Sequence, residues 1–411
     1  MQLNVPRHLA LFLPALQGGG AERVVLDLAR AFSQSGHLVD LVLSRLRGEL
    51  VSDVPDSVRI VELGTPRPAI SILSLLRLPV DTWSAILPAL ARKPLKKVRS
   101  LPRLERYLVE ERPDVLMAST DIPNLLALWA ARLARAETRV FVKQDISLAQ
   151  RVKKATSPLE RKLPRLIRRW YPRADGIIAV SAGVADELVQ VADVPREKIR
   201  VIYNPVDLRR IATLAAEAID DPWFRPGEPP VLVAAGRLHK QKDYPTLFRA
   251  FSRARARTKL RLVILGEGEE RPQLEALSRE LGLSEDVRLL GFQRNPYAYM
   301  ARATAFVLSS VYEGLPTVLI EALACGCRVV STDCPTGPSE LLEGGRYGRL
   351  VPVADDAALA EGILATLHAP RSAEQLRRKA ESFSIETVAD SYLRLLLSTR
   401  SSPSRDHGDV Q

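Results

Sequence analysis

Short apolar runs alternate with segments of helical periodicity along this chain, and the alternation occurs in two separate series. In the first series, runs such as Leu9–Leu13 and Leu38–Leu43 are followed by segments whose apolar residues recur every three or four positions. A second series runs from Val231 to Val330. Because successive strand–helix units connect through right-handed crossovers, each series predicts a parallel β-sheet covered by helices. The pattern therefore predicts an α/β fold with two doubly wound, Rossmann-like domains.

The apolar runs and the turn residues between them also predict the domain boundaries. We expect strands at Leu9–Leu13, Leu38–Leu43, Val115–Ala118, Val140–Val142, Ile177–Val180, Ile199–Tyr203, Val231–Ala235, Leu260–Leu265, Val287–Leu290, Ala305–Leu308 and Arg328–Val330. The turn-rich, strand-free stretch 207–230 predicts a linker between a domain over 1–206 and a second over 231–382. A helix is expected over 383–397, followed by a disordered polar tail over 398–411.

Composition places the chain among soluble globular proteins. Hydrophobic residues make up 46% and charged residues 26%, whereas disordered chains carry fewer apolar residues and membrane proteins carry far more. Cys325, Cys327 and Cys334 show neither the paired spacing of a zinc site nor a disulfide framework, so we expect buried thiols in a reducing, cytoplasmic compartment. The run Leu9–Leu16 is short and contains Pro14, so a buried strand explains it better than a signal peptide.

Positive charge is concentrated in two stretches of the first domain. The net charge is +11, and residues 92–112 hold eight basic and three acidic residues, whereas 151–173 hold nine basic residues and one acidic. Such stretches favour phospholipid headgroups or nucleic acid, or form a solvated face with no partner. Nucleic acid is disfavoured because stacking aromatics are not interleaved with the cations. We expect an anionic membrane surface as the partner.

Apolar residues at helical spacing accompany the second basic stretch. They are Leu159, Leu163, Leu166, Ile167 and Trp170. Pro164 interrupts the pattern, so a kinked or split helix is expected. This apolar face either lies on a bilayer as a peripheral helix or packs on the first domain. Residues 69–91 contain charges and prolines that exclude a membrane span, although the segment is compatible with lying on a membrane surface.

Three motifs follow predicted strands at the ends where parallel sheets bind ligands. Gly18, Gly19 and Gly20 precede the first helix, where glycines let a phosphate approach the backbone; alternatively they form only a tight turn. The turn lacks GxGxxG spacing, which disfavours a nicotinamide enzyme. Arg237 and Lys242 follow the first strand of the second domain and could clamp a diphosphate, or be ordinary surface charges.

Two glutamates flank the start of a predicted helix in the second domain. Glu313 lies in the loop before Pro316, and Glu321 lies in the second turn of the helix that this proline begins. The spacing lets one carboxylate meet a sugar and the other a ribose. The alternative is that each glutamate serves only as a helix cap or in a salt bridge.

These residues together resemble glycosyltransferase family 4, the retaining enzymes that have the GT-B fold and use nucleotide-sugars. Glu313 and Glu321 match the family's EX7E element, with Gly236-Arg237 and Lys242 upstream at the family's spacing. The resemblance covers about residues 8–395. It implies two Rossmann-like domains that face a cleft, with the helix from Phe383 crossing back onto the first domain.

The resemblance implies a role for each matching residue. Arg237 and Lys242 would neutralise the donor diphosphate, Glu313 would hold the hydroxyls of the transferred sugar, and Glu321 would bind the ribose. Further donor contacts would come from Gly19 and Gly20, from the loop of Gly314, Leu315, Pro316 and Thr317, and from Leu290 and Phe292 beside the base. No Asp-x-Asp pair occurs in the sequence, and we expect no cofactor and no required metal.

The first domain departs from the family at one place. Many members carry a histidine that touches the donor sugar near the strand matched by Val115–Ala118. Here Asp121 follows that strand, and all five histidines lie elsewhere. Asp121 could contact the sugar instead, or cap the following helix.

The resemblance implies a hexosyl- or N-acetylhexosaminyltransferase that acts on a glycan, with a lipid-linked surface-polysaccharide precursor and a UDP-sugar favoured. We expect it to lie peripherally on the cytoplasmic face of the membrane. Two alternatives remain at this point. One is a catalytically inactive GT-B module that binds a glycan or a partner, and the other is a GT-B epimerase or phosphorylase.

Overall fold

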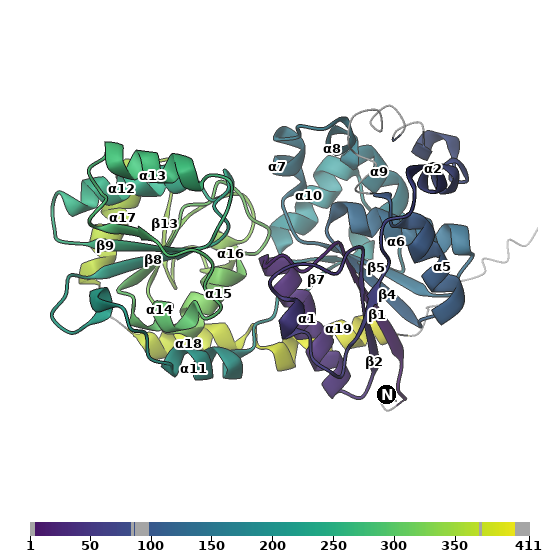
Figure 1. Ribbon diagram of the computed structural model, residues 1–411, viewed down its shortest axis with the longest axis horizontal. Helices are drawn as coiled ribbons and strands as arrows, with labels where there is room; N and C mark the ends of the chain where they lie inside the picture. Colours follow the sequence, from purple (N-terminus) through teal and green to yellow (C-terminus); the bar gives the residue numbers. More distant parts are fainter. Residues whose placement is uncertain (1–4, 84–85, 87–97, 370–371, 399–411) are drawn as a thin grey trace, which may run out of the picture.

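Two parallel β-sheets organise the chain in the computed structural model, which describes residues 5–83, 86, 98–369 and 372–398. Figure 1 shows the two sheets side by side, each with helices on both faces, and a yellow C-terminal helix beneath them. The predicted α/β architecture with two doubly wound sheets is confirmed. The predicted tail lies outside the described residues beyond Ser398.

The first sheet has seven parallel strands in the order β3-β2-β1-β4-β5-β6-β7. Its strands are β1 (His8–Leu13), β2 (Leu38–Leu43), β3 (Arg59–Glu62), β4 (Val115–Ser119), β5 (Arg139–Gln144), β6 (Gly176–Ala179) and β7 (Ile199–Val201). Strand β3 was not predicted from the sequence. This edge strand is short, and none of its residues is buried, so it lacks the apolar run that marked the others.

The second sheet has six parallel strands in the order β10-β9-β8-β11-β12-β13. Its strands are β8 (Val231–Ala235), β9 (Arg261–Leu265), β10 (Val287–Leu289), β11 (Ala305–Leu308), β12 (Val329–Thr332) and β13 (Arg349–Val351). The three-residue edge strand β13 was also missed, because only Val351 in it is buried. The strand order reverses between β8 and β11, which is where such sheets bind ligands.

Helices cover both sheets. In the first half of the chain they are α1 (Gly20–Gln34), α2 (Pro68–Leu76), α5 (Leu101–Glu111), α6 (Asp121–Ala134), α7 (Leu148–Lys153), α8 (Pro158–Arg161), α9 (Leu163–Trp170) and α10 (Ala182–Ala192). In the second half they are α11 (Leu208–Ala216), α12 (Tyr244–Arg255), α13 (Arg271–Glu280), α14 (Tyr297–Arg302), α15 (Thr317–Ala324), α16 (Pro338–Leu341), α17 (Asp356–His368), α18 (Ala373–Glu381) and α19 (Ile385–Leu397). Short 3-10 turns occur at η1 (Val51–Asp53), η2 (Tyr171–Arg173), η3 (Arg196–Lys198) and η4 (Pro222–Phe224).

Two segments join the halves of the molecule. The stretch 207–230 holds no strand, but it contains α11, a helix that the turn-rich sequence did not predict. Helix α19 returns to the first half, where its buried Val388, Tyr392 and Leu396 join the core on one face of the first sheet. Burial of these apolar side chains therefore fixes the C-terminal helix on the first half of the molecule.

The basic stretch 151–173 folds into α7, α8, α9 and η2. The break between α8 and α9 confirms the expected split helix. Its apolar residues Leu159, Leu163, Ile167 and Trp170 are almost fully buried in the core of the first half, so the expectation that this face lies on a bilayer is wrong. The packing alternative holds because burying these side chains is more favourable than leaving them in water. Its cations remain on the outer side.

Two further expectations can be compared with the structure. Cys325, Cys327 and Cys334 are buried free thiols, as expected. Along the described part of the chain, no helix is both long enough and apolar enough to cross a bilayer.

Candidate active site

Lys242 and Glu313 meet where β8 and β11 end in the second sheet. The Lys242 ammonium lies 2.7 Å from Glu313 Oε1. Its carbon chain passes over Gly236, since a Cβ at that glycine would lie 3.0 Å from Lys242 Cε. Two residues that are 71 positions apart in sequence are therefore brought together by adjacent strands of one sheet.

Glu313 is held on several sides. Its side chain also accepts from the Ser310 hydroxyl at 2.6 Å and from Gln241 Nε2 at 3.3 Å, and only 8% of the residue is exposed. The carboxylate is therefore oriented by the protein itself, with a cation beside it. A group in this position can accept hydrogen bonds from sugar hydroxyls.

The loop that carries Glu313 packs against the first half of the molecule. Ser147 N–H donates to the Glu313 carbonyl at 3.2 Å, and the Ser181 hydroxyl donates to the Gly314 carbonyl at 2.9 Å. A Cβ at Gly314 would lie only 2.1 Å from the Asp145 carbonyl oxygen, so only glycine permits this approach. The predicted donor-loop glycine therefore has a structural role at the contact between the halves.

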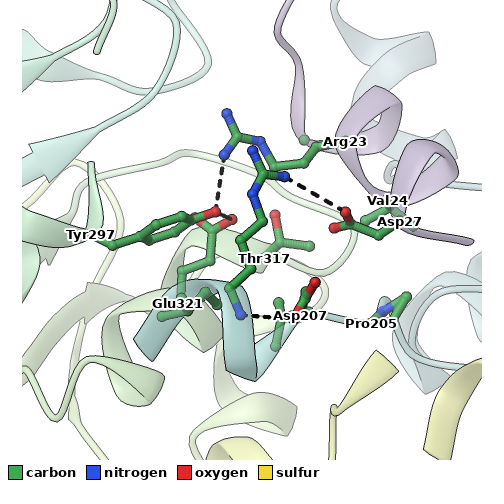
Figure 2. Close-up of a pocket in the computed structure, with 12 residues that line it drawn as sticks. Arg23, Val24, Asp27, Pro205, Asp207, Tyr297, Thr317 and Glu321 are labelled. Atoms are coloured by element: carbon green, nitrogen blue, oxygen red, sulfur yellow. Dashed lines mark hydrogen bonds and ion pairs between the residues drawn. The ribbon is translucent and has the colours of Figure 1, made fainter. Parts of the chain in front are cut away.

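Glu321 lines a pocket between the two halves. The pocket is bounded by Gly20, Arg23, Val24, Asp27, Pro205, Val206, Asp207, Arg210, Ile211, Tyr297, Thr317 and Glu321. The Tyr297 hydroxyl donates to Glu321 Oε1 at 3.3 Å, and Arg23 Nη1 donates to the Tyr297 oxygen at 2.9 Å. Figure 2 shows Arg23 reaching from α1 toward Tyr297, which lies beside Glu321.

Burial sets the electrostatics of this pocket. It raises the pKa of Glu321, and the positive charge of Arg23 partly opposes that rise. It also raises the pKa of Asp27 to about 6, against the opposing charges of Arg30 and Arg210. Arg30 lies 3.0 Å from Asp27 and Arg210 lies 4.0 Å from it. The pocket therefore holds three carboxylates, Asp27, Asp207 and Glu321, and cations from both α1 and α11.

The glycine turn faces the second half at the start of α1. A Cβ at Gly20 would lie 3.2 Å from Thr317 Oγ1, so the amino ends of α1 and α15 converge. Helix amino ends favour anions, because their N–H groups are unpaired and the helix dipole is positive there. Glu22 occupies part of the turn, since its Oε2 accepts from Gly19 N–H at 2.8 Å.

The remaining predicted donor contacts lie around this turn. Burial raises the pKa of Glu22, and the charge of Arg237, which is exposed just after β8, is among the interactions that partly oppose this rise. Phe292 lies against the turn, since a Cβ at Gly18 would lie 3.4 Å from its ring. Leu290 lies just past β10 and bonds through its N–H to the Ile264 carbonyl. Leu315 and Pro316 continue the loop from Gly314 to Thr317.

Asp121 lies in a buried polar cluster at the ends of β4 and β5. It is the first residue of α6, not its cap, which corrects the capping alternative. Its oxygens already have partners: Gln144 Nε2 donates to Oδ1 at 2.7 Å, and Arg151 Nε lies 3.4 Å from Oδ2. Burial raises the pKa of Asp121. The sugar contact stays a prediction.

The same cluster contains a buried ion pair. Lys143 is fully buried and pairs with Asp145, which also accepts from the Ser119 hydroxyl at 2.6 Å. Thr120, which directly follows β4, has a φ of 77°, a strained value for a residue with a side chain. Its N–H donates to Asp145 at 3.1 Å. These bonds hold the 145–147 loop, which in turn contacts the Glu313 loop.

The sequence analysis found the motifs but missed several residues that complete the Glu321 pocket. Tyr297, Arg210 and Asp27 carry no local pattern that separates them from other helical residues. Arg23 follows the glycine turn closely in the sequence, but no role was predicted for it. Among the residues that the structure describes, no three His, Cys, Asp or Glu side chains gather as a metal site would require.

Comparison with known families matches both halves of the chain. Residues 18–210 match the family described as "Glycosyltransferase Family 4", and residues 216–383 match "Glycosyl transferases group 1". A Campylobacter jejuni relative is 34% identical over 380 residues, covering 92% of this chain and 94% of the relative. It is named as an N-acetylgalactosamine-N,N'-diacetylbacillosaminyl-diphospho-undecaprenol 4-alpha-N-acetylgalactosaminyltransferase.

Two more distant proteins are similar over most of the chain. The lipopolysaccharide 1,6-galactosyltransferase of Escherichia coli is 26% identical over 64% of this chain and 68% of its own length. The crystal structure of Anabaena HepE with UDP-glucose superposes with a TM-score of 0.76 at 18% identity, covering 96% of this chain and 100% of that one. At that identity the structural likeness shows the shared fold.

Proposed function

This chain belongs to glycosyltransferase family 4 and is a glycosyltransferase with the GT-B fold, and from that premise we propose its reaction. It transfers a hexose or N-acetylhexosamine from a UDP-sugar, with retention of the anomeric configuration, to a lipid-linked glycan. The Campylobacter jejuni relative is named for a diphospho-undecaprenol acceptor, and HepE was crystallised with UDP-glucose. Both observations support the substrate classes.

The contact between Lys242 and Glu313 carries this proposal. It places a cation and an oriented carboxylate 2.7 Å apart, at the strand-order reversal where an α/β sheet binds ligands. Arg237 and the converging amino ends of α1 and α15 add positive potential on the same side. The arrangement suits a donor whose sugar meets Glu313 and whose diphosphate meets Arg237 and Lys242.

In this reaction the bond between the sugar C1 and the diphosphate oxygen breaks, and the electron pair leaves with the diphosphate. The acceptor hydroxyl forms the new bond to C1 from the same face, and its proton passes to the departing diphosphate. In this proposal Glu313 binds the sugar hydroxyls and is not the nucleophile, and Lys242 and Ser310 orient its carboxylate for that role. Stabilising the charge that develops on the leaving group is then the main electrostatic task.

Glu321 binds the ribose of the donor in this proposal. Its carboxylate lies in the interdomain pocket with Tyr297, so ribose hydroxyls would donate to an oxygen that the protein already orients. The base would lie beside Phe292 and Leu290 at the end of β10. No cofactor is required, and Arg237 and Lys242 take the role that a divalent cation has in other glycosyltransferases.

Three measurements on the same protein test the donor, the stereochemistry and the metal requirement. Thermal-shift measurements with UDP-, GDP- and ADP-sugars should show stabilisation by UDP-sugars, because a ligand that binds the folded state raises its stability. With the stabilising donor, NMR of the product should show the anomeric configuration of the donor, and EDTA should leave turnover unchanged. An inverted product or loss of activity in EDTA would contradict the proposal. An epimerase would convert the sugar of the nucleotide-sugar into its epimer without any acceptor. A binding module would not hydrolyse the nucleotide-sugar.

The acceptor class implies a membrane location. We propose that the cations of 98–112 and 151–173 attract the protein to an anionic cytoplasmic membrane surface; residues 92–97 of the first basic stretch lie outside the described part. Each cation near such a surface contributes on the order of 1 kcal/mol. Co-sedimentation with vesicles should increase with anionic lipid and decrease with salt. Binding that ignores both would contradict peripheral attachment.

A further inference from the structure

A basic pocket lies on the first half of the molecule, outside the donor site. Lys162, Arg165, Arg168, Arg169 and Arg173 line it together with Asp81, Leu166 and Pro172. We call these eight residues the basic pocket. Positions 162, 165, 169 and 173 lie three or four residues apart, which places them along one side of α9 and η2. Five cationic side chains therefore surround one opening, with a single carboxylate among them.

The fold holds these cations on the outside. The opposite side of α9 carries Leu163, Ile167 and Trp170, which are almost fully buried. The Trp170 ring Nε1 donates to the Thr82 hydroxyl at 3.1 Å, and the Arg173 guanidinium lies over that ring, 5.3 Å from its centre. Because the apolar side is locked into the core, α9 cannot rotate its charges inward.

The charge of the pocket is only partly balanced. Asp81 pairs with Arg169, and Asp193 lies 2.9 Å from Arg168 in a mostly exposed pair. Within the described residues, Lys162 and Arg165 have no ion pair with a carboxylate. Five cations face these two carboxylates, so the pocket keeps an excess of positive charge. Several guanidinium groups around one opening suit a compact ligand with more than one negative charge, such as a diphosphate.

Among the residues that the structure describes, exposed apolar side chains lie next to the pocket. Ile70, Leu73 and Leu76 lie three residues apart on α2, and with Val80 they are 45% to 66% exposed. The opposite side of α2 is buried through Ser71, Ser74 and Leu75. Val80 directly precedes Asp81, which pairs with Arg169 in the pocket. A hydrocarbon chain could therefore lie on α2 while a charged group next to it occupies the pocket.

The other end of the pocket leads toward the donor site. Arg151 on α7 lies 3.3 Å from Glu160 on α8, and the same side chain contacts Asp121 at the end of the first sheet. Helix α8 ends at Arg161, immediately before Lys162 of the pocket. Figure 1 shows α7, α8 and α9 following one another from the side facing the second sheet toward α2. The order is donor site, basic pocket, apolar surface.

We propose that the basic pocket binds the diphosphate of the lipid-linked acceptor. The glycan would extend from the pocket along α8 and α7 toward Glu313, and the lipid chain would extend over the apolar surface of α2. This inference rests on the proposed function for the identity of the acceptor. A diffuse attraction to anionic lipids is a different mechanism, because it depends on total charge and not on which cations carry it.

Vesicles that differ only in the chemistry of their charge test the pocket. Phosphatidylcholine vesicles containing undecaprenyl diphosphate are compared with vesicles of equal charge density containing phosphatidylglycerol. The wild type should bind the first about tenfold more tightly, the ratio that ~1.4 kcal/mol provides. The variant Lys162→Gln/Arg165→Gln should lose this preference, and it leaves no carboxylate without a partner. Equal binding of the wild type to both vesicles would overturn the proposal.

A matched variant separates the pocket from total charge. Arg132→Gln/Arg200→Gln removes two exposed cations from the same half, outside the basic stretches. It should keep the preference for undecaprenyl diphosphate, and an equal loss in both variants would also overturn the proposal. Leu73→Asn should weaken binding to undecaprenyl diphosphate vesicles but not to inorganic pyrophosphate. An equal effect of Leu73→Asn on both ligands would contradict the apolar part.

The proposed reaction is measured separately. Hydrolysis of the UDP-sugar without acceptor uses the donor site alone, so Lys162→Gln/Arg165→Gln should hydrolyse it at the wild-type rate. If the wild type neither binds nor hydrolyses a nucleotide-sugar, the proposed function fails, whatever the vesicles show. If hydrolysis is normal and the lipid preference is absent, only the pocket proposal fails.

Discussion

The two parallel sheets use their carboxyl ends differently. In the second sheet, Lys242 pairs with the buried Glu313, and Arg237 in the same loop as Lys242 is exposed. In the first sheet, Lys143 and Asp121 are buried, and their charges are met by Asp145, Gln144 and Arg151 inside the protein. The edge of the second sheet leaves Arg237 exposed to solvent, whereas the edge of the first sheet pairs its buried charges within the fold.

This difference shows how one architecture can serve two purposes. A buried polar cluster is favourable only when its hydrogen bonds are made, and then it holds its loops in one arrangement. The 145–147 loop is held in this way and contacts the loop of Glu313 and Gly314. In the proposed function, the first sheet orients the donor site and the second supplies most of its chemistry. The predictions below test this division.

The largest effect is expected from the two cations of the second sheet. Arg237→Ala and Lys242→Ala should each lower turnover about a hundredfold, because losing a charge contact to the leaving group costs about 3 kcal/mol in the transition state. Lys240→Ala is the matched control, since it removes an exposed cation from the same loop. Steady-state kinetics measure the effect. Near-normal turnover in both variants would show that the diphosphate is bound elsewhere.

Glu321→Ala should mainly weaken donor binding. The ribose would lose a hydrogen bond to a charged group, which is worth about 2 kcal/mol, or roughly thirtyfold in affinity. Calorimetric titration with the UDP-sugar measures this loss. Glu280→Ala, at the exposed end of α13, serves as a control of equal charge change. An unchanged affinity together with reduced turnover would move Glu321 from ribose binding to catalysis.

Asp121→Ala tests whether the first sheet is structural at this position. Removing the carboxylate takes one acceptor from Gln144 and one from Arg151 in a buried cluster, although Gln144 keeps the Ile146 carbonyl and Arg151 keeps Glu160, so we expect a loss of about 2 kcal/mol in the free energy of unfolding. Urea denaturation measures this loss. Turnover per folded molecule should fall by a smaller factor than the one to which this loss of free energy corresponds. A large fall in turnover with unchanged stability would instead support the contact of Asp121 with the donor sugar.

Arg23→Met tests the one cation that the first half sends into the Glu321 pocket. Arg23 opposes the rise that burial causes in the pKa of Glu321, and Tyr297 and Arg210 act in the same direction. Without Arg23 the pKa of Glu321 rises further. As the pH is lowered, Glu321 is then protonated at a higher pH than in the wild type, and donor binding should begin to weaken there. We expect about a fivefold higher donor KM on the acid side, corresponding to ~1 kcal/mol.

The pH profile separates this effect from a packing defect. Arg23→Lys should restore much of the acid range because it keeps the charge, whereas a packing role would not distinguish lysine from methionine in this way. A uniform change in donor KM at every pH would show that Arg23 acts by shape and not by charge.

Asp27 predicts a dependence of stability on pH. Its pKa in the folded protein, about 6, lies above the ordinary value of 3.8, so the folded state holds the proton more tightly. Stability should therefore decrease as pH rises between these values, by on the order of 1 kcal/mol per pH unit. Urea denaturation of wild type and Asp27→Asn at several pH values measures this slope. A decrease of the same size in Asp27→Asn would assign it to other groups.

Local patterns in the sequence predicted most of the fold. Each buried strand can be recognised from a stretch of ten residues or fewer, because a strand covered on both faces appears in the sequence as an apolar run bounded by turns. The same locality explains the misses: β3 and β13 are edge strands with little burial, so nothing in their composition separates them from loops. Helix α11 was missed because the prolines and glycines after it dominate that stretch.

The site divides in the same way. Gly236, Arg237, Lys242, Glu313 and Glu321 stand in short motifs whose spacing could be compared with a family. Tyr297 belongs to no motif and is identified only by its hydrogen bonds to Arg23 and Glu321. Those bonds join three helices, α1, α14 and α15, whose approach depends on how the two halves pack.

The basic stretch 151–173 gives the clearest contrast. Its charge and its helical spacing were evident in the sequence, but the spacing alone could not distinguish a helix lying on a bilayer from one packed on a sheet, since both bury the same apolar face.

The sequence by itself therefore determined the two sheets, the order of their elements and the charged motifs of the second one, because these depend on neighbouring residues. The tertiary structure decided which apolar faces are covered, which charges are paired and which helices meet across the two halves. Such contacts join residues far apart in the chain, and their energies depend on burial and distance that exist only after folding.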